Sequence, residues 1–348
     1  MNIKDVDKNF NIETKIEEKN LRFISALEDP FDLYGTCGER YLRLPLNDAT
    51  RVSEGVKQLA ANTSGVRIRF KTDSKFVAVS VRYSDVCRIE HMSLVGTAEL
   101  DMYTYESGKY SYRTLFLPPM NMEDFFESIY YFDDQSMRDI TINLPLYSSV
   151  SDIYIGLDKN ALLEHGERYK NKRPVVYYGS SITQGGCAAR PGNSYPSIIS
   201  RKLNLDFLNL GFSGNAKGEA EMAEYIATLD MSCFVLDYDF NAPTVEFIKN
   251  THRQFFEIVR KKNPMLPIII MSMPYNAWVK DIGERKRIIK ETFDLAVAGG
   301  DENVYFVDGE KTFDIFGGDS GTVDGTHPND LGFMCMALEL ERYMEGLV

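Results

Sequence analysis

The segment VVYYGSSIT at residues 175–183 decides the fold of the second half of this 348-residue chain. Four apolar residues run into a glycine-flanked serine turn, as a buried strand does where it leaves a parallel sheet. Further apolar runs follow it, and amphipathic stretches with helical periodicity separate them. We therefore predict a parallel sheet that is covered by helices on both faces.

The predicted elements alternate from Arg173 to the C-terminus. Strands are expected at residues 175–178, 205–210, 233–238, 267–273 and 304–307. Helices are expected at residues 195–203, 218–229, 244–262, 281–298 and 329–346. This alternation predicts a flavodoxin-like, three-layer α/β/α domain with a five-stranded parallel sheet.

The pattern of short alternating runs in the first half of the chain predicts an all-β domain. Residues 65–70 and 75–81 alternate with period two and are separated by Asp73-Ser74, which predicts a β-hairpin. Further short strands are expected at residues 98–106, 110–117, 139–144 and 152–157. Such a series is typical of a β-sandwich, with a jelly-roll-like form. The polar residues 164–173 are the expected linker, so we predict a β-sandwich domain over 1–165 and a catalytic domain over 166–348.

Charge and composition exclude several classes of partner. The chain has 39 Lys and Arg against 51 Asp and Glu, a net charge of −12, which disfavours nucleic acid. No apolar run is long enough for a membrane span and the N-terminus is polar, so we expect no membrane partner and a cytoplasmic location. Five cysteines without regular spacing fit a reducing compartment and predict no metal site. No cofactor is expected, and a homo-oligomer remains open.

Three residues at the ends of predicted strands suit nucleophilic catalysis. Active sites of open parallel sheets lie beyond the carboxyl ends of the strands, where Ser181 falls. A serine nucleophile needs a base, and the base needs an acceptor that orients it. Of the four histidines only His327 lies in a strand-end loop, and Asp324 precedes it by three residues. A flexible glycine-serine loop and a helix-entry turn are the competing structural interpretations of the same segments.

Two further loops offer groups that could hold an oxyanion. Gly214 follows the second predicted strand and Asn241 the third, and a backbone N–H or a side-chain amide can bind the negative charge of an acyl-transfer intermediate. Cys187 and Arg190, just after the serine, and Trp278, after the fourth strand, are candidates for substrate binding. Ordinary packing is the alternative for each of these three.

Four short blocks in this order resemble the conserved blocks of SGNH (GDSL-like) hydrolases. They are GSSIT at 179–183, GFSGN at 211–215, DFN at 239–241 and DGTHP at 324–328. The resemblance implies Ser181 as nucleophile, His327 as base and Asp324 as the residue that orients it. It also implies an oxyanion hole formed by the Ser181 and Gly214 backbone amides and the Asn241 side chain. Two positions depart from the common pattern: Ser180 replaces an aspartate and Asp239 replaces a glycine.

Leu100-Asp101-Met102-Tyr103 resembles the core of the GxDLY domain that precedes one branch of this family, although Glu99 or a gap replaces its glycine. The resemblance implies a serine esterase that removes a small acyl group, such as acetyl, from a carbohydrate or another small hydroxylated compound. An acyltransferase with the same residues and a non-catalytic carbohydrate-binding protein are the alternatives. An α/β-hydrolase elbow would need glycine where Thr183 stands, and no nucleotide-binding glycine loop occurs.

Overall fold

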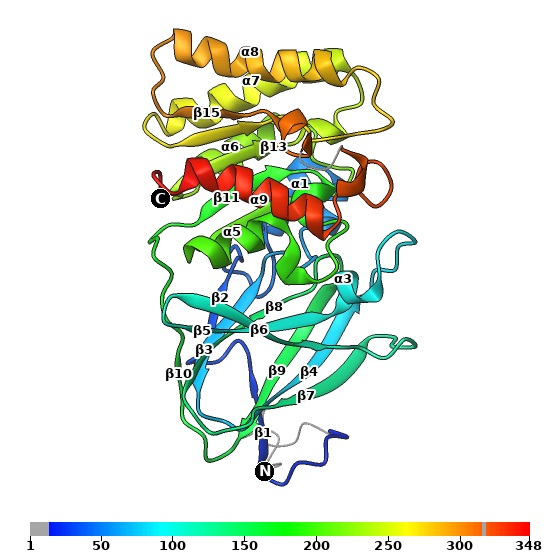
Figure 1. The fold of residues 1–348 in the computed structure, drawn as a ribbon, viewed down its shortest axis with the longest axis vertical. Helices are drawn as coiled ribbons and strands as arrows, with labels where there is room; N and C mark the ends of the chain where they lie inside the picture. The colour runs from blue at the N-terminus through cyan, green and yellow to red at the C-terminus, as the bar shows by residue number, and fades with distance from the viewer. Residues whose placement is uncertain (1–13, 315–317) are drawn as a thin grey trace.

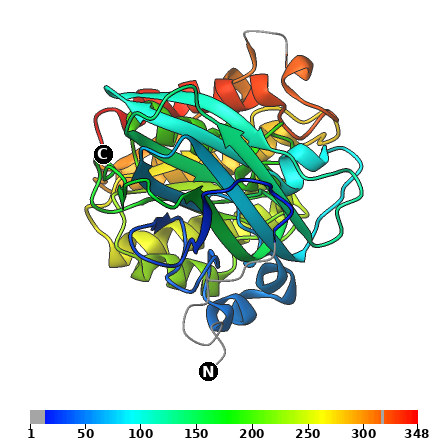
Figure 2. The same cartoon turned by 90° about the horizontal axis from the view of Figure 1, so that it is seen from below.

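The computed structural model describes residues 14–314 and 318–348. A β-rich half and an α/β half are stacked along the long axis (Figure 1), and the view along that axis places the β strands in front of the α/β layers (Figure 2). Among the described residues, no helix combines the length and apolar character needed to cross a membrane.

The α/β half is built on a five-stranded sheet in which every pairing is parallel. Its order is β12 (Phe207–Gly211), β11 (Val175–Gly179), β13 (Cys233–Asp237), β14 (Ile268–Met271) and β15 (Val304–Val307). In chain order within the sheet this is 2-1-3-4-5, the flavodoxin-like arrangement. The prediction of a flavodoxin-like parallel sheet is confirmed.

Helices cover both faces of this sheet. One face packs against α6 (Ala220–Thr228), α7 (Val245–Lys262) and α8 (Ile282–Ala298), and the other against α5 (Tyr195–Leu203) and α9 (Asp330–Met344). Successive strand residues point to opposite faces, so Val176 joins the first core and Val175 the second. Both faces are therefore apolar, which explains why these strands read as continuous apolar runs.

Short helical turns complete the chain. They are α1 (Leu46–Val52), α2 (Glu54–Leu59), α3 (Leu94–Ala98), α4 (Ser181–Gln184) and the 3-10 turns Pro191–Asn193, Asp239–Asn241, Gly309–Lys311 and Asp319–Gly321. Two of them carry candidate site residues: α4 begins at Ser181, and the turn Asp239–Asn241 ends at Asn241.

The β half contains two antiparallel sheets that face each other, which confirms the predicted β-sandwich. One has the order β1 (Leu21–Ser25), β9 (Ser149–Asp158), β4 (Phe76–Asp85) and β7 (Phe125–Tyr131). The other has the order β10 (Leu163–His165), β3 (Arg67–Thr72), β8 (Arg138–Asn143), β5 (Leu100–Glu106) and β6 (Lys109–Phe116), with β2 (Asp32–Tyr34) also on β3. Side chains from both sheets form one core.

The predicted hairpin between the first two of these strands is wrong. β3 pairs with β8, β10 and β2, whereas β4 pairs with β7 and β9, so the Asp73-Ser74 turn crosses from one sheet to the other. Ile68 of β3 and Val79 of β4 both belong to the core between the sheets. Period-two alternation identifies a half-buried strand but does not show whether its neighbour pairs with it or faces it across a sandwich.

Helices α1 and α2 belong to the first half of the chain but pack on the second. Ala49 and Val56 are fully buried in the core that also contains Met222 of α6. Neither helix was predicted from the sequence. The division at 1–165 and 166–348 stays a prediction, and the segment that carries α1 and α2 shows that the two halves share packed surface.

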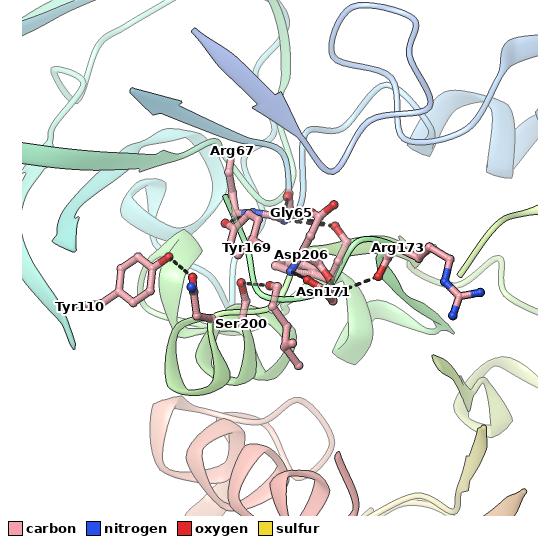
Figure 3. Close-up of polar contacts among 11 residues, drawn as sticks. Gly65, Arg67, Tyr110, Tyr169, Asn171, Arg173, Ser200 and Asp206 are labelled. Atoms are coloured by element: carbon pink, nitrogen blue, oxygen red, sulfur yellow. Dashed lines mark hydrogen bonds and ion pairs between the residues drawn. The ribbon is translucent and has the colours of Figure 1, made fainter. Parts of the chain in front are cut away.

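Polar contacts also join the two halves between β3 and the residue that precedes β12. Figure 3 shows Arg67 of β3 extending toward Asp206, which precedes β12, and a guanidinium nitrogen lies 2.5 Å from an Asp206 carboxylate oxygen. Arg67 Nε also donates to the Tyr169 hydroxyl at 3.0 Å, and Tyr169 is buried. Asn171 accepts from the Asp206 backbone N–H at 2.7 Å. The expected linker is therefore packed into the interface.

Arg43 is fully buried between the halves and binds backbone carbonyls on both sides. Its guanidinium donates to the carbonyls of Leu59 and Asn62 at 2.6 and 2.7 Å, and to those of Asn209 and Gly211 at 2.7 and 2.9 Å. The planar fork of arginine suits this arrangement because its donors point in several fixed directions. Arg43 thus ties the chain around α2 to the end of β12.

We expect Arg43→Lys to lower the free energy of unfolding by about 3 kcal/mol, because an ammonium cannot reach all four carbonyls and buried acceptors lose their donors. Chemical denaturation measures the change. The exposed Arg40, 3.8 Å from Asp152, provides the control: Arg40→Lys should change stability by less than about 0.5 kcal/mol. Equal effects of the two substitutions would contradict the role given to Arg43.

Candidate active site

The first three candidate loops leave the sheet at one edge because their strands are in register there. Gly179 of β11 lies opposite Gly211 of β12 and Asp237 of β13. Gly179 has no room for a side chain, since a Cβ atom would lie 2.0 Å from Thr183 Oγ1 and 2.4 Å from the Asp237 carbonyl oxygen. The close approach lets the chain turn directly into α4, whose first residue is Ser181.

Ser181, His327 and Asp324 form one hydrogen-bonded chain. Ser181 Oγ lies 2.9 Å from His327 Nε2, and His327 Nδ1 lies 2.7 Å from Asp324 Oδ2. Asp324 Oδ1 accepts from the backbone N–H groups of Thr326 at 3.0 Å and His327 at 2.7 Å. The carboxylate is thereby fixed by its own turn, and it in turn fixes the imidazole.

The Asp324 carboxylate determines which nitrogen of His327 carries the proton. Partial burial by itself would raise the pKa of Asp324, but hydrogen bonds from the His327 backbone, the His327 ring and the Thr326 backbone, together with the His327 charge, lower it. An ionised carboxylate only accepts, so His327 Nδ1 must donate to it. Nε2 is then left to accept the Ser181 hydroxyl proton.

A buried polar network supports the serine turn from beneath. Thr183 Oγ1 and the Tyr195 hydroxyl each donate to Asp237 Oδ2 at 3.1 Å. Burial, and then the nearby Asp239 carboxylate, raise the pKa of Asp237 to about 8. These contacts link α4, α5 and the end of β13, so the position of Ser181 is fixed relative to the loop after β13.

The β half contacts the segment around the serine. The Tyr147 hydroxyl donates to the Ser181 carbonyl at 3.2 Å. Asp101, from the motif that resembles GxDLY, accepts from the Gly192 backbone N–H at 2.7 Å and from Asn143 Nδ2 at 2.6 Å. Asp101 is fully buried. The motif therefore contributes to the site by positioning the loop that follows Ser181.

Two of the three predicted oxyanion donors, Gly214 and Asn241, lie on the loops after β12 and β13. Gly214 has φ +68°, and a Cβ atom built on it would meet nothing within 4 Å. Asn241 Nδ2 donates to the Phe212 carbonyl at 3.1 Å, which ties the third block to the second and leaves its other N–H for a ligand. Asp239, which departs from the family pattern, accepts from the Met273 backbone N–H at 3.1 Å and so anchors the Asn241 turn to the end of β14.

The three predicted substrate-binding residues occupy different environments. Cys187 is buried, and its N–H donates to the Pro328 carbonyl at 3.0 Å, next to His327; burial and then Asp324 raise the pKa of Cys187 to about 12. Arg190 donates to the Tyr103 hydroxyl at 3.2 Å and lies over the Tyr112 ring, an interface position. Trp278 is 74% exposed, and its Nε1 donates to the Asp324 carbonyl at 2.9 Å. The substrate roles of all three stay predictions.

His91 lies beside His327, and no pattern in the sequence predicts this proximity. The two ring centroids are 5.1 Å apart. His91, Cys187 and His327 are also the one group among the described residues whose ligand atoms could together hold a metal ion. The remaining histidines lie elsewhere: His252 is buried in α7, where burial lowers its pKa to about 3, and His165 contacts Asp29 and Asp32.

Profiles of known protein families match both halves of the chain. The profile of the GDSL-like Lipase/Acylhydrolase family matches residues 172–345, and the N-terminal profile of SGNH-hydrolase-type esterases, GxDLY, matches residues 21–163. The chain belongs to the GDSL-like lipase/acylhydrolase family. This membership makes the protein an esterase of the SGNH type, as the four sequence blocks predicted.

Solved structures of similar proteins share both halves of this GDSL-like esterase. A protein from Bacteroides ovatus described as a GDSL-like lipase is 30% identical, with a TM-score of 0.85, and the match covers 94% of this chain and 98% of that one. A salicylyl-acyltransferase from a tetracycline biosynthetic pathway is 22% identical, with a TM-score of 0.77 and coverage of 95% and 98%. An acetyl xylan esterase from the rumen bacterium Butyrivibrio proteoclasticus is 14% identical, with a TM-score of 0.57 and coverage of 94% and 98%. The last two share the fold. A search of curated proteins returned no match.

Proposed function

We propose that this esterase uses Ser181, His327 and Asp324 as a catalytic triad and acts through an acyl-enzyme intermediate. The observation that carries the proposal is the unbroken chain from Ser181 Oγ through His327 to Asp324, with steps of 2.9 and 2.7 Å. These lengths lie within the range for a nucleophile, its base and the group that orients the base.

The chemistry follows from the proton positions. Ser181 Oγ attacks the ester carbonyl carbon while its proton passes to His327 Nε2, and the resulting imidazolium is stabilised by Asp324. The tetrahedral intermediate then expels the alcohol, which takes the proton from Nε2. A water molecule then attacks the acyl-enzyme carbonyl and gives its proton to His327 Nε2. The acid leaves, and Ser181 Oγ takes the proton back from Nε2. In both acylation and deacylation, the oxyanion is bound by the Ser181 and Gly214 backbone amides and the Asn241 side-chain amide.

The proposed substrate is an acylated carbohydrate or another small hydroxylated compound carrying a short acyl group such as acetyl. An exposed indole beside the Asp324 turn is the feature of this chain that supports a sugar, because the flat faces of sugar rings stack on aromatic side chains. Acetyl xylan esterase is the named activity of one protein with this fold. The net charge of −12 supports a neutral substrate over a polyanion.

Acyl transfer is the second candidate because a protein of this architecture along nearly its whole length is a salicylyl-acyltransferase. Both reactions share the acyl-enzyme and differ in what attacks it. Hydrolysis of p-nitrophenyl acetate in the presence of an added alcohol or sugar separates them. Release of acetate in proportion to p-nitrophenol supports the esterase, whereas preferential acetylation of the acceptor supports the transferase.

We expect Asn241→Ala to lower kcat by about 10²- to 10³-fold, because a preorganised donor to the oxyanion is lost. The chain offers a matched control in Asn215, whose amide donates to the Ser213 carbonyl at 2.8 Å. Asn215→Ala should change kcat less than about threefold. Steady-state kinetics on p-nitrophenyl acetate measures both, and similar values for the two variants would show that Asn241 does not hold the oxyanion.

We expect Trp278→Ala to raise KM for an acetylated oligosaccharide by about tenfold, since stacking on one aromatic ring contributes on the order of 1 kcal/mol or more. KM for p-nitrophenyl acetate should stay nearly constant because this ester has no sugar ring. Trp278→Phe, which keeps an aromatic face, should retain much of the affinity. An equal rise of KM for both substrates would instead indicate that the Asp324 turn has been disturbed.

A further inference from the structure

Three side chains that bind transition metals converge at the candidate active site. The ligand atoms of His91, Cys187 and His327 all lie within 4.8 Å of one another. Cys187 is buried, and the His91 ring lies at 30° to the His327 ring. One ligand comes from the β half, one from the loop after Ser181 and one from the loop before α9. The juxtaposition therefore exists only in the folded chain.

Local contacts fix where two of the ligands lie. The Cys187 backbone N–H donates to the Pro328 carbonyl at 3.0 Å, so the backbone that carries the thiol is held against the His327 loop. His327 is oriented by its bond to Asp324. His91 stands on a short exposed turn closed by the bridge between Ile89 and Met92. An exposed ring on such a turn can rotate to complete a coordination shell.

The Asp324 carboxylate also suits metal binding. A histidine that binds zinc commonly donates its second ring N–H to a carboxylate, which fixes the tautomer and strengthens the ligand nitrogen. Asp324 Oδ2 takes this place on His327 Nδ1, at 2.7 Å. The nitrogen that remains for a metal is Nε2, the atom that also contacts Ser181 Oγ.

The available atoms select the kind of ion. Both Asp330 oxygens already accept hydrogen bonds, from the Ala189 N–H at 2.8 Å and from Asn193 Nδ2 at 2.7 Å, and both Asp324 oxygens are engaged as well. Two imidazoles and a thiolate therefore remain. Such a set favours zinc and related transition metals over Mg²⁺ or Ca²⁺, which require oxygen ligands.

The geometry fits a three-ligand zinc site with one open position. With bonds of about 2.0 to 2.3 Å, tetrahedral ligand atoms are about 3.3 to 3.8 Å apart, so a spacing within 4.8 Å closes by shifts of about 1 Å. A cavity of about 430 Å³, lined by His91, Cys187, Val323 and Asn329 among others, adjoins the group and leaves room for a fourth ligand such as water.

We propose that His91, Cys187 and His327 form a Zn²⁺ site that switches the esterase off. The Cys187 thiol gives its proton to the solvent, and its sulfur and the two imidazole nitrogens donate lone pairs to the ion, with no change of oxidation state. Zinc on His327 Nε2 takes the lone pair that would accept the Ser181 proton. The inhibitory consequence rests on the proposed triad, whereas the binding of the metal does not.

Cobalt provides a test of binding that needs no turnover. Co²⁺ added to the full-length Ser181→Ala protein should give a near-ultraviolet thiolate-to-cobalt charge-transfer band that saturates at one equivalent, and Zn²⁺ should abolish it by displacement. Cys187→Ser should lose the band. His91→Ala should lower the affinity for Zn²⁺ at least about tenfold, since even loss of an outer-shell partner costs that much affinity. The matched Cys335→Ser and His165→Ala variants should bind as the parent does.

Absence of the band from the Ser181→Ala protein, or its persistence in Cys187→Ser, would overturn the proposal. Unchanged Zn²⁺ affinity in His91→Ala would do the same, and this variant removes only an exposed side chain, so folding is not at issue. In wild-type protein, Zn²⁺ should inhibit hydrolysis of p-nitrophenyl acetate, and His91→Ala should raise the half-inhibitory concentration at least about tenfold. If the chain proved to lack esterase activity, the cobalt result would still decide the metal site.

Discussion

Ser181→Ala is expected to lower esterase turnover by about 10⁶-fold, the loss that accompanies removal of the nucleophile from a serine triad. The substitution deletes the oxygen that forms the acyl-enzyme bond. The fold should persist, because the deleted oxygen contacts His327 at 2.9 Å and contributes about 1 kcal/mol at most to stability. Hydrolysis of p-nitrophenyl acetate, together with thermal unfolding of the same preparation, measures both expectations.

The adjacent serine is the matched control for this prediction. Ser180 caps α4 by accepting from the Ile182 N–H at 3.2 Å, and it is fully buried. Ser180→Ala should therefore lose about 1 kcal/mol of stability yet still react with a fluorophosphonate at Ser181. Labelling at position 180, or turnover near the wild-type rate in purified Ser181→Ala, would remove Ser181 from the mechanism.

The α/β half was predictable because its signals are local. Each strand from β11 to β15 is a short apolar run, and the ends of α5 to α9 fall within two residues of those expected. The caps explain this accuracy: Thr244 and Asn329 accept from backbone N–H groups at the starts of α7 and α9. The candidate triad was also predictable, since Asp324 and His327 sit on one turn and Ser181 directly follows a strand.

What the sequence did not reveal depends on contacts between distant segments. The predicted pairing of β3 with β4 is wrong because alternation identifies the buried face of a strand but not the strand that pairs with it. The burial of Arg43 has no local signal in the sequence, since the carbonyls that it binds lie 16 to 168 positions away along the chain. His91 lies outside the predicted strand-end loops, and only the folded chain places its ring 5.1 Å from that of His327.

Asp324→Asn is the second substitution with a large expected effect, a loss of up to about 10⁴-fold in kcat/KM. An asparagine can keep one oxygen on the Thr326 and His327 N–H groups, which presents its NH₂ to His327 Nδ1. Nδ1 must then accept, so the ring proton moves to Nε2 and points at Ser181 Oγ, where a base is needed. The exposed Asp319 lies in the same loop, and Asp319→Asn should change kcat/KM less than about threefold.

The effects of substitutions within the triad are expected to be non-additive, and His91 is the alternative base against which this is tested. His327→Ala should cost nearly as much as Ser181→Ala, and the double variant should be scarcely worse than either, because each residue works only through the other. His91 is the imidazole that lies against His327, yet the described residues show no hydrogen bond between His91 and Ser181. If His327→Ala retained substantial turnover and His91→Ala in that background removed it, the base would be His91. Loss of all turnover in His327→Ala with His91 intact would instead assign the proton transfer to the nitrogen that lies 2.9 Å from Ser181 Oγ.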